Sequence, residues 1–217
     1  MRYKLSSGIE IRAENAAKSA AQPSRFLLKI LSELPPVVDS FDYGCGKLRY
    51  FQALTNTTDT LSLIDSEIQI SRHQIILGEK NSIRKMMSNY NHIDVYNNFE
   101  FKNIGHKYDR GFCINVLSVI PCFDIRREVL NTIRERLKKN SRCLFSVQYR
   151  NSDFKRMQKM PNTQPFLDGF IVDSYRGYSF YGLIPPKNLQ SLLINSGFKI
   201  LDIKINDGSV FMWASPL

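Results

Sequence analysis

The sequence contains no uninterrupted apolar run that approaches the ~18 residues of a membrane-spanning helix. Residues 1–14 are polar and include acidic side chains, without the apolar core that a secretory signal needs. We therefore expect neither secretion nor membrane insertion, and a cytoplasmic protein is the default expectation.

Paired metal ligands are also missing from the sequence. The four cysteines have wide, irregular spacings without a CxxC pair, and none of the three histidines is near a cysteine. Buried free thiols in a reducing compartment explain this cysteine usage, and no metal site is predicted. The cysteines are Cys45, Cys113, Cys122 and Cys143.

Negative charge is scarce relative to positive charge. The 217 residues carry 30 Lys and Arg against 20 Asp and Glu, a formal net charge of +10. Residues 124–159 contain 11 of these basic residues and only four acidic ones. A basic excess attracts polyanions, so this stretch favours a nucleic acid or another anionic partner. The alternative is a solvated helix face in a generally basic protein.

Strand-like and helix-like patterns alternate along the chain. Strands are predicted at residues 37–44, 60–65, 92–99, 110–120, 143–149, 198–205 and 209–215. Helical spacing is found at residues 23–34, 47–54, 124–139 and 186–198, and from residue 67 with a break near residue 78. The alternation over the first 150 residues predicts an α/β fold, with a mostly parallel sheet between helices and an antiparallel hairpin at its end.

In such a sheet the ligand crevice lies beyond the carboxyl ends of the central strands. The first predicted strand ends in Asp42, followed by a turn with Gly44 and Gly46, which lets a ligand approach the backbone closely. The second ends in Asp65, 21 residues after Gly44. An acid at that position is placed to bind the hydroxyl pair of a ribose. The alternative for Asp65 is the N-cap of the helix that follows.

These segments resemble the class I S-adenosylmethionine-dependent methyltransferases. VVDSFDYGCG resembles the first family motif, LSLIDSE the second and YDRGFCINVLSVIP the fourth. LKKNSRCLFSVQYR resembles the approach to the fifth strand, and LQSLLINSGFKILDIKI the closing helix and strand. The resemblance implies a Rossmann-like fold with a seven-stranded sheet, S-adenosylmethionine as cofactor, and methyl transfer by direct SN2 attack on the sulfonium methyl.

The resemblance also assigns roles to individual residues. Asp42, Gly44, Cys45 and Gly46 would contact the methionine part of the cofactor, Asp65 with Ser66 the ribose, and Asn98, or less so Asn97, the adenine amine. Asn115 would line the cleft near the sulfonium; the alternative is an asparagine satisfied by backbone. The sequence departs from the family at Leu48, which stands where a third glycine is usual.

The methyl acceptor leaves little trace in the sequence. Amino-directed DNA methyltransferases carry a tetrapeptide that begins with Asp, Asn or Ser, continues with two prolines and ends with an aromatic residue. Residues 115–118 of this chain read NVLS and do not match it. Pro121-Cys122 lies past the strand end and does not match the nucleophile of cytosine-C5 enzymes. We place acceptor recognition in the unmatched residues 150–186, as a substrate-side insertion or lid. The candidate catalytic or acceptor-contacting residues are Asn115 and, within this segment, Tyr175, Arg176 and Tyr178, whereas Phe166, Phe170 and Phe180 fill the core.

We expect one methyltransferase-like domain over residues 1–217, with a helical cap at residues 1–36. SAAQPSRFLLKILSELPPVVDSFDYGCG also weakly resembles the opening of methyltransferases associated with DNA-modification and phage-defence loci. A nucleic-acid or nucleotide acceptor is slightly favoured over a small molecule. The remaining alternative is a degenerate methyltransferase fold that acts as a binding or scaffold subunit with a protein partner.

Overall fold

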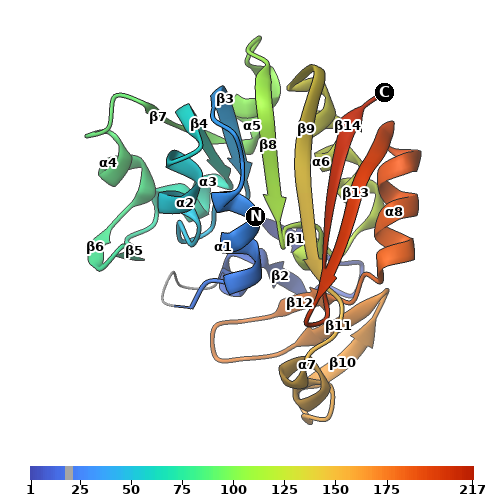
Figure 1. Ribbon diagram of the computed structural model, residues 1–217. Coiled ribbons are helices and arrows are strands. Elements are labelled where there is room, and N and C mark those ends of the chain that lie inside the picture. The colour runs from blue at the N-terminus through green and yellow to red at the C-terminus, as the bar shows by residue number, and fades with distance from the viewer. Residues whose placement is uncertain (18–21) are drawn as a thin grey trace.

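A seven-stranded sheet forms the centre of the computed structural model, which describes residues 1–17 and 22–217 (Figure 1). The strand order is β13-β14-β9-β8-β3-β4-β7, and the five strands from β9 to β7 are parallel. Their bounds are β3 (Val37–Tyr43), β4 (Thr58–Asp65), β7 (Ile93–Asn97), β8 (Tyr108–Ile114) and β9 (Leu137–Gln148). β14 (Ser209–Pro216) and β13 (Phe198–Asn206) form the antiparallel hairpin. The predicted fold class is therefore confirmed.

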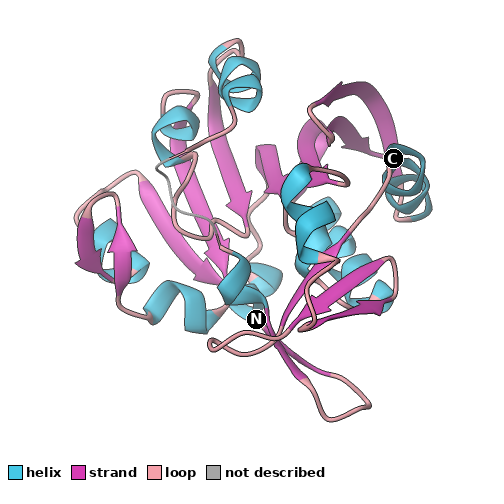
Figure 2. Ribbon diagram, turned by 90° about the horizontal axis from the view of Figure 1, so that it is seen from below, coloured by secondary structure: helices cyan, strands magenta, loops and turns pink. Residues whose placement is uncertain are grey.

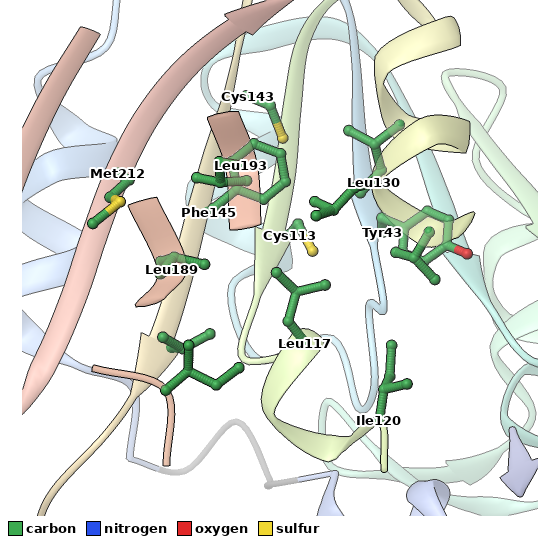
Figure 3. Close-up of a cluster of buried hydrophobic side chains, with 14 of the residues drawn as sticks. Tyr43, Cys113, Leu117, Ile120, Leu130, Cys143, Phe145, Leu189, Leu193 and Met212 are labelled. Carbon is green, nitrogen blue, oxygen red and sulfur yellow. The ribbon is translucent and has the colours of Figure 1, made fainter. Parts of the chain in front are cut away.

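Helices cover both faces of the sheet. One face packs against α1 (Arg25–Ser32), α2 (Phe51–Thr55), α3 (Glu67–Ser71) and α4 (Ile83–Met87). The other packs against α5 (Asn98–Asn103), α6 (Phe123–Glu135) and α8 (Pro186–Asn195). Because successive strand side chains point to opposite faces, Leu144 and Phe145 of β9 lie in different core clusters. Figure 3 shows Leu130 of α6 and Leu189 of α8 in the second cluster.

Two predicted helices differ from the structure because the backbone reverses at left-handed residues. The helix expected from Glu67 ends at Ser71, and a hairpin of β5 (Gln74–Ile76) and β6 (Glu79–Asn81) precedes α4. Leu77 and Gly78 form its turn with φ of 49° and 92°, a conformation that ends helices. The helix expected at residues 47–54 begins only at Phe51, after Leu48 at φ 60°.

The strand predicted over residues 110–120 ends at Ile114. Asn115 follows with φ 59°, and the 3-10 turn η2 (Leu117–Val119) completes the segment. The helix α6 begins at Phe123 and β9 already at Leu137, before the predicted 143–149. Three of the four cysteines are buried, and all four are free thiols, as predicted. Within the described residues no helix has the length and apolar character needed to cross a membrane.

The N-terminal segment is not uniformly helical as expected for residues 1–36. It begins with a hairpin of β1 (Arg2–Lys4) and β2 (Glu10–Arg12), followed by the 3-10 turn η1 (Ala13–Ala16). Polar and apolar residues alternate over these short segments, a pattern that favours strands over a helix. The expected helix is α1, capped by Ser24. Residues 19–21, which begin the weak resemblance to phage-defence methyltransferases, lie outside the described residues.

Residues 150–186 form α7 (Ser152–Met157) and a three-stranded antiparallel sheet of β10 (Thr163–Phe166), β11 (Gly169–Val172) and β12 (Ser179–Gly182). This sheet joins the N-terminal hairpin: Ile11 bridges Tyr178, and the Arg12 N–H donates to the Tyr178 carbonyl at 2.8 Å. We call residues 1–17 and 150–186 together the cover. In Figure 1 the cover lies at the end of the sheet to which the β8 arrow points, and Figure 2 shows the molecule from below, the side on which the cover lies.

Candidate functional site

A cleft opens where the cover meets the carboxyl ends of β3, β4 and β8. β3 lies between β4 and β8, so the chain leaves neighbouring strands in opposite directions at this point. Such a switch point is where doubly wound sheets bind ligands. The predicted residues that line the cleft are Asp42, Gly44, Cys45, Gly46, Asp65, Asn98 and Asn115.

The loop after β3 approaches the cleft with bare backbone. Gly44 and Gly46 have φ of 81° and 59°, which residues other than glycine adopt at a cost. A Cβ on Gly44 would overlap the side chain of Val116. The N–H groups of Gly44 and Cys45 donate to the Ile64 carbonyl at 2.7 and 3.0 Å, which ties the loop to the end of β4. A ligand can therefore lie directly against this loop.

Asp65 fixes the loop from the neighbouring strand. Its Oδ2 accepts the Gly46 N–H at 2.9 Å, and its Oδ1 accepts the Ser66 N–H at 2.7 Å. Burial raises the pKa of Asp65, and these two hydrogen bonds oppose the rise. The N-cap of α3 is Ser66, whose hydroxyl accepts the Gln69 N–H at 3.4 Å. The N-cap alternative for Asp65 is therefore wrong. Ser66 caps α3 and, through its N–H, also holds the Asp65 carboxylate.

Asp42 is a buried carboxyl at the floor of the cleft. Only 6% of the residue is exposed. Burial, with the Asp65 carboxylate nearby, raises the pKa of Asp42 to about 7. Burial also raises the pKa of the Cys45 thiol well above its ordinary value, so the thiol stays protonated near neutrality. The carboxyl groups of Asp42 and Asp65 therefore lie together at the sheet side of the cleft, which favours a cationic ligand.

The two asparagines at the end of β7 have different contacts. Asn97 is the N-cap of α5: its Oδ1 accepts the Glu100 N–H at 2.9 Å, and its Nδ2 donates to Glu67 at 2.9 Å. Asn98 lines the cleft, and its buried Oδ1 has no hydrogen-bond partner within the described residues. The preference for Asn98 over Asn97 as a ligand contact agrees with this geometry.

Asn115 turns the chain into the cleft after β8. Its φ of 59° is in the left-handed region, which asparagine tolerates better than most residues. Its N–H donates to the Ser146 carbonyl at 2.7 Å, and its carbonyl accepts the Ser118 hydroxyl at 3.3 Å. Residue 115 thus has its backbone groups bonded and lines the cleft.

The structure does not bring Tyr175, Arg176 and Tyr178 into the cleft. Tyr175 is 89% exposed, and the Arg176 guanidinium lies over its ring at 5.1 Å. Tyr178 is used in the bridge to the N-terminal hairpin. The cover instead presents Phe154 and Tyr181 to the cleft. Strand alternation was the missed signal, because it sends the buried Phe180 and its neighbour Tyr181 to opposite faces.

The N-terminal segment supplies lining that sequence reasoning missed. Tyr3 and Glu14 are both buried and line the cleft. Glu14 Oε1 accepts a hydrogen bond from Arg2 Nε at 3.0 Å, whereas Oε2 has no hydrogen bond within the described residues. The amino group of Met1 lies 3.8 Å from Oε2. No local motif marks Glu14, because its position depends on contacts with distant parts of the chain.

Unsatisfied polar atoms gather around the cleft. A buried polar atom without a partner is costly, and such atoms often await a ligand or water. Those on cleft-lining residues are Glu14 Oε2, Arg49 Nε, Gln69 Oε1 and Asn98 Oδ1. Together with the bare glycine loop and Asp65, they fit a nucleoside with hydroxyl and amine donors. Among residues 1–17 and 22–217, no group of three His, Cys, Asp or Glu side chains is placed to hold a metal ion.

Comparison with known sequences identifies a relative of this chain. The chain is 33% identical over 208 residues to the uncharacterized protein YmfD of Escherichia coli K12, covering 94% of this chain and 92% of YmfD. The chain belongs to the YmfD family. No protein-family model matches the sequence.

Solved structures of similar shape identify the fold of this chain. An S-adenosylmethionine-dependent methyltransferase from Clostridium acetobutylicum superposes with a TM-score of 0.62 at 14% identity, over 93% of this chain and 94% of that one. The N-methyltransferase NodS of Bradyrhizobium japonicum, solved with S-adenosylhomocysteine, gives 0.57 at 12% identity, over 88% and 84%. The fold is that of the class I S-adenosylmethionine-dependent methyltransferases.

Proposed function

We propose that this protein is an S-adenosylmethionine-dependent methyltransferase acting on a small molecule. The observation that carries the proposal is the cleft itself. It gathers a bare glycine loop, the carboxyl groups of Asp42 and Asp65, and the unpartnered Asn98 Oδ1 at one switch point. NodS, which has a similar structure and was solved with S-adenosylhomocysteine, supports the choice of ligand.

Each cofactor contact uses a group already in place. Asp65 would accept hydrogen bonds from the ribose hydroxyls, and Asn98 Oδ1 one from the adenine amine. The backbone at Gly44 and Gly46 leaves room for the methionine part, and the Asp42 carboxylate favours a positively charged ligand. When bound, the cofactor supplies an electrophilic methyl group that can pass directly to a nucleophile. The chain then contributes alignment of the acceptor and exclusion of water.

Leu48 does not obstruct this cofactor. The residue is 1% exposed and packs in the core cluster that contains Leu27 and Phe51. Its N–H donates to the Cys45 carbonyl at 2.9 Å, which closes the turn after the glycine loop. The Leu48 side chain, which replaces the usual glycine, thus packs in the core and not in the cleft. It gives no support to a degenerate, purely scaffolding fold.

The walls beyond the cofactor residues favour a small acceptor. Tyr3 from the N-terminal hairpin, and Phe154 and Tyr181 from the second part of the cover, line the cleft together. Aromatic side chains supply apolar area with one polar tip, which suits a compact ligand. Glu14 Oε2, 3.8 Å from the Met1 amino group, adds a carboxylate oxygen that accepts no hydrogen bond within the described residues. This supports an acceptor whose nucleophilic atom carries a proton.

The basic residues of 124–159 give less support to a nucleic acid than expected. Arg126 is 1% exposed and bonds Asp168 through both terminal nitrogens, at 2.5 and 2.8 Å. Lys138 pairs with Asp109 at 2.8 Å and lies 3.6 Å from Asp39. The Arg142 guanidinium lies over the Trp213 ring at 4.7 Å. These three of the eleven cations have partners within the chain, which supports a small acceptor more than a polyanion.

Transfer of labelled methyl groups tests the proposal. The purified protein would be incubated with methyl-labelled S-adenosylmethionine and, separately, a low-molecular-weight extract or a nucleic-acid extract. We expect label in the small-molecule fraction, and a strong loss with Glu14→Gln if that carboxylate handles the proton. Label in nucleic acid, with binding that weakens steeply with salt, would overturn the acceptor class. Tight cofactor binding without transfer to either fraction would contradict an enzyme.

A further inference from the structure

The strand β13 ends the sheet with an exposed apolar stripe. Leu201, Ile203 and Ile205 are 50%, 39% and 54% exposed. Ile203 lies opposite Met212 of β14, and that methionine is fully buried. Only the beginning of β13 is covered, since Phe198 shares a core cluster with residues of α8. Within the described residues, β14 is the only strand with which β13 pairs.

The opposite edge of the sheet is built differently. β7 has five residues, carries the exposed Asp94, and leads directly into the capped helix α5. Short length and charge are common protections of a sheet edge. β13 has nine residues and one irregularity, between Ile200 and Asp202. From Asp202 to Asn206 its register with β14 is regular, so this part presents an ordered edge of backbone donors and acceptors.

The side chains of β13 are complementary to themselves. In an antiparallel pair centred on Ile203, Lys204 lies opposite Asp202 of the partner subunit, and Ile203 opposite Ile203 of the partner subunit. Asp202 and Lys204 are 49% and 45% exposed and only 3.8 Å apart, so both charges project to one face. Opposite charges and aliphatic pairs directly across strands stabilise a sheet. A two-fold axis needs such a self-complementary patch.

We propose that two copies of this chain associate through β13 in antiparallel orientation, with the two-fold axis at Ile203. The two central sheets then form one continuous sheet, and the exposed aliphatic side chains become paired. None of the cleft-lining residues belongs to β13, so both clefts stay open. The association is therefore independent of the proposed enzymatic activity.

Sedimentation velocity over low to high micromolar protein concentrations tests the dimer with three variants. The wild type should pass from monomer to dimer. Asp202→Lys and Lys204→Asp each place two like-charge pairs in the dimer, and we expect the dissociation constant to rise about tenfold. The double variant Asp202→Lys/Lys204→Asp restores opposite charges and should return to the wild-type constant. Asp94→Lys on β7 is the matched control and should have no effect.

Three results would overturn the proposal. They are a wild type that stays monomeric throughout, single variants that dimerise as the wild type does, and a double variant that dimerises no better than the singles. Circular dichroism of every variant shows whether a loss reflects the interface or the fold. Labelled methyl transfer is measured separately, so failure of the dimer and failure of the enzymatic proposal are distinguishable.

Discussion

The two walls of the cleft are held in place by different kinds of interaction. On the sheet side, parallel strands fix the glycine loop through adjacent backbone bonds. Asp65 accepts the Gly46 N–H of this loop at one oxygen and the Ser66 N–H at the other. On the cover side, Tyr3 and Tyr181 come from segments about 180 residues apart, joined by one β-bridge and a few side-chain contacts. The wall formed by the sheet is therefore stiff and local, whereas the wall formed by the cover depends on a small number of anchors.

Breaking the main anchor of the cover should have the largest effect. Arg126→Ala removes a buried guanidinium that binds Asp168 and the Ile120 carbonyl, and we expect a loss of about 3–5 kcal/mol in the free energy of unfolding. Arg127→Ala is the matched control. Its surface pair with Asp124, at 3.3 Å, is worth about 1 kcal/mol or less. Urea unfolding measures both, and equal effects would contradict the anchor.

Limited proteolysis sharpens the same comparison. In Arg126→Ala we expect cleavage within the cover while the sheet stays protected, because local opening follows the weakest contacts. The affinity for S-adenosylhomocysteine should fall only a few-fold. A complete loss of that affinity would show that the two walls are not independent.

The pH dependence of the free energy of unfolding tests the burial of Asp42 in the cleft. The pKa of Asp42 is about 7 in the folded state, against 3.8 for the ordinary carboxyl. Between these values the native state holds a proton that the unfolded chain releases. The contribution of Asp42 is therefore most favourable below pH 4 and falls as pH rises through the window to about 7.

Asp42→Asn removes this titration. The free energy of unfolding of the variant should rise relative to that of the wild type as pH rises from 4 to 8, by up to about 1.4 kcal/mol per pH unit within the window. Asp59→Asn, at the exposed start of β4, should leave the curve unchanged. Urea titrations at several pH values give the free energy of unfolding as a function of pH. If this function is parallel for Asp42→Asn and the wild type, the pKa of Asp42 is not raised by burial.

Restoring the family glycine should destabilise the protein. Leu48→Gly relieves a left-handed backbone, a gain of about 1–2 kcal/mol, but empties a buried leucine site, a loss of about 2–5 kcal/mol. Leu48→Ala loses the same packing without the relief and should be less stable than Leu48→Gly by about 1 kcal/mol. Thermal unfolding orders the three proteins, and an alanine variant as stable as the glycine variant would contradict the strain.

Sequence patterns predicted the sheet side of the molecule far better than the cover. Asp42, Gly44, Gly46 and Asp65 follow strands whose apolar runs are local, so strand ends and spacing locate them. Tyr175 was misplaced because composition says which side chains a segment has but not where the strands end: the residue lies in the loop between β11 and β12, and Tyr181 of β12 lines the cleft instead.

Glu14 was missed for a similar reason. Its role arises from burial against Arg2 and the cleft, a contact that no spacing encodes. The charge of Arg126 likewise gave the wrong impression of a surface cation, since its partner Asp168 lies 42 residues away. Local chemistry could be predicted from the sequence, whereas long-range partners could not.

Calorimetric titration with S-adenosylhomocysteine tests the central claim most directly. The wild type should bind, and Asp65→Ala should bind at least about 100-fold more weakly, because it removes the ribose acceptor and the brace of the Gly46 N–H. Asp59→Ala, on the same strand but far from the cleft, should bind as the wild type does. Absence of binding by the wild type, or unchanged binding by a folded Asp65→Ala, would contradict a cofactor site in this cleft.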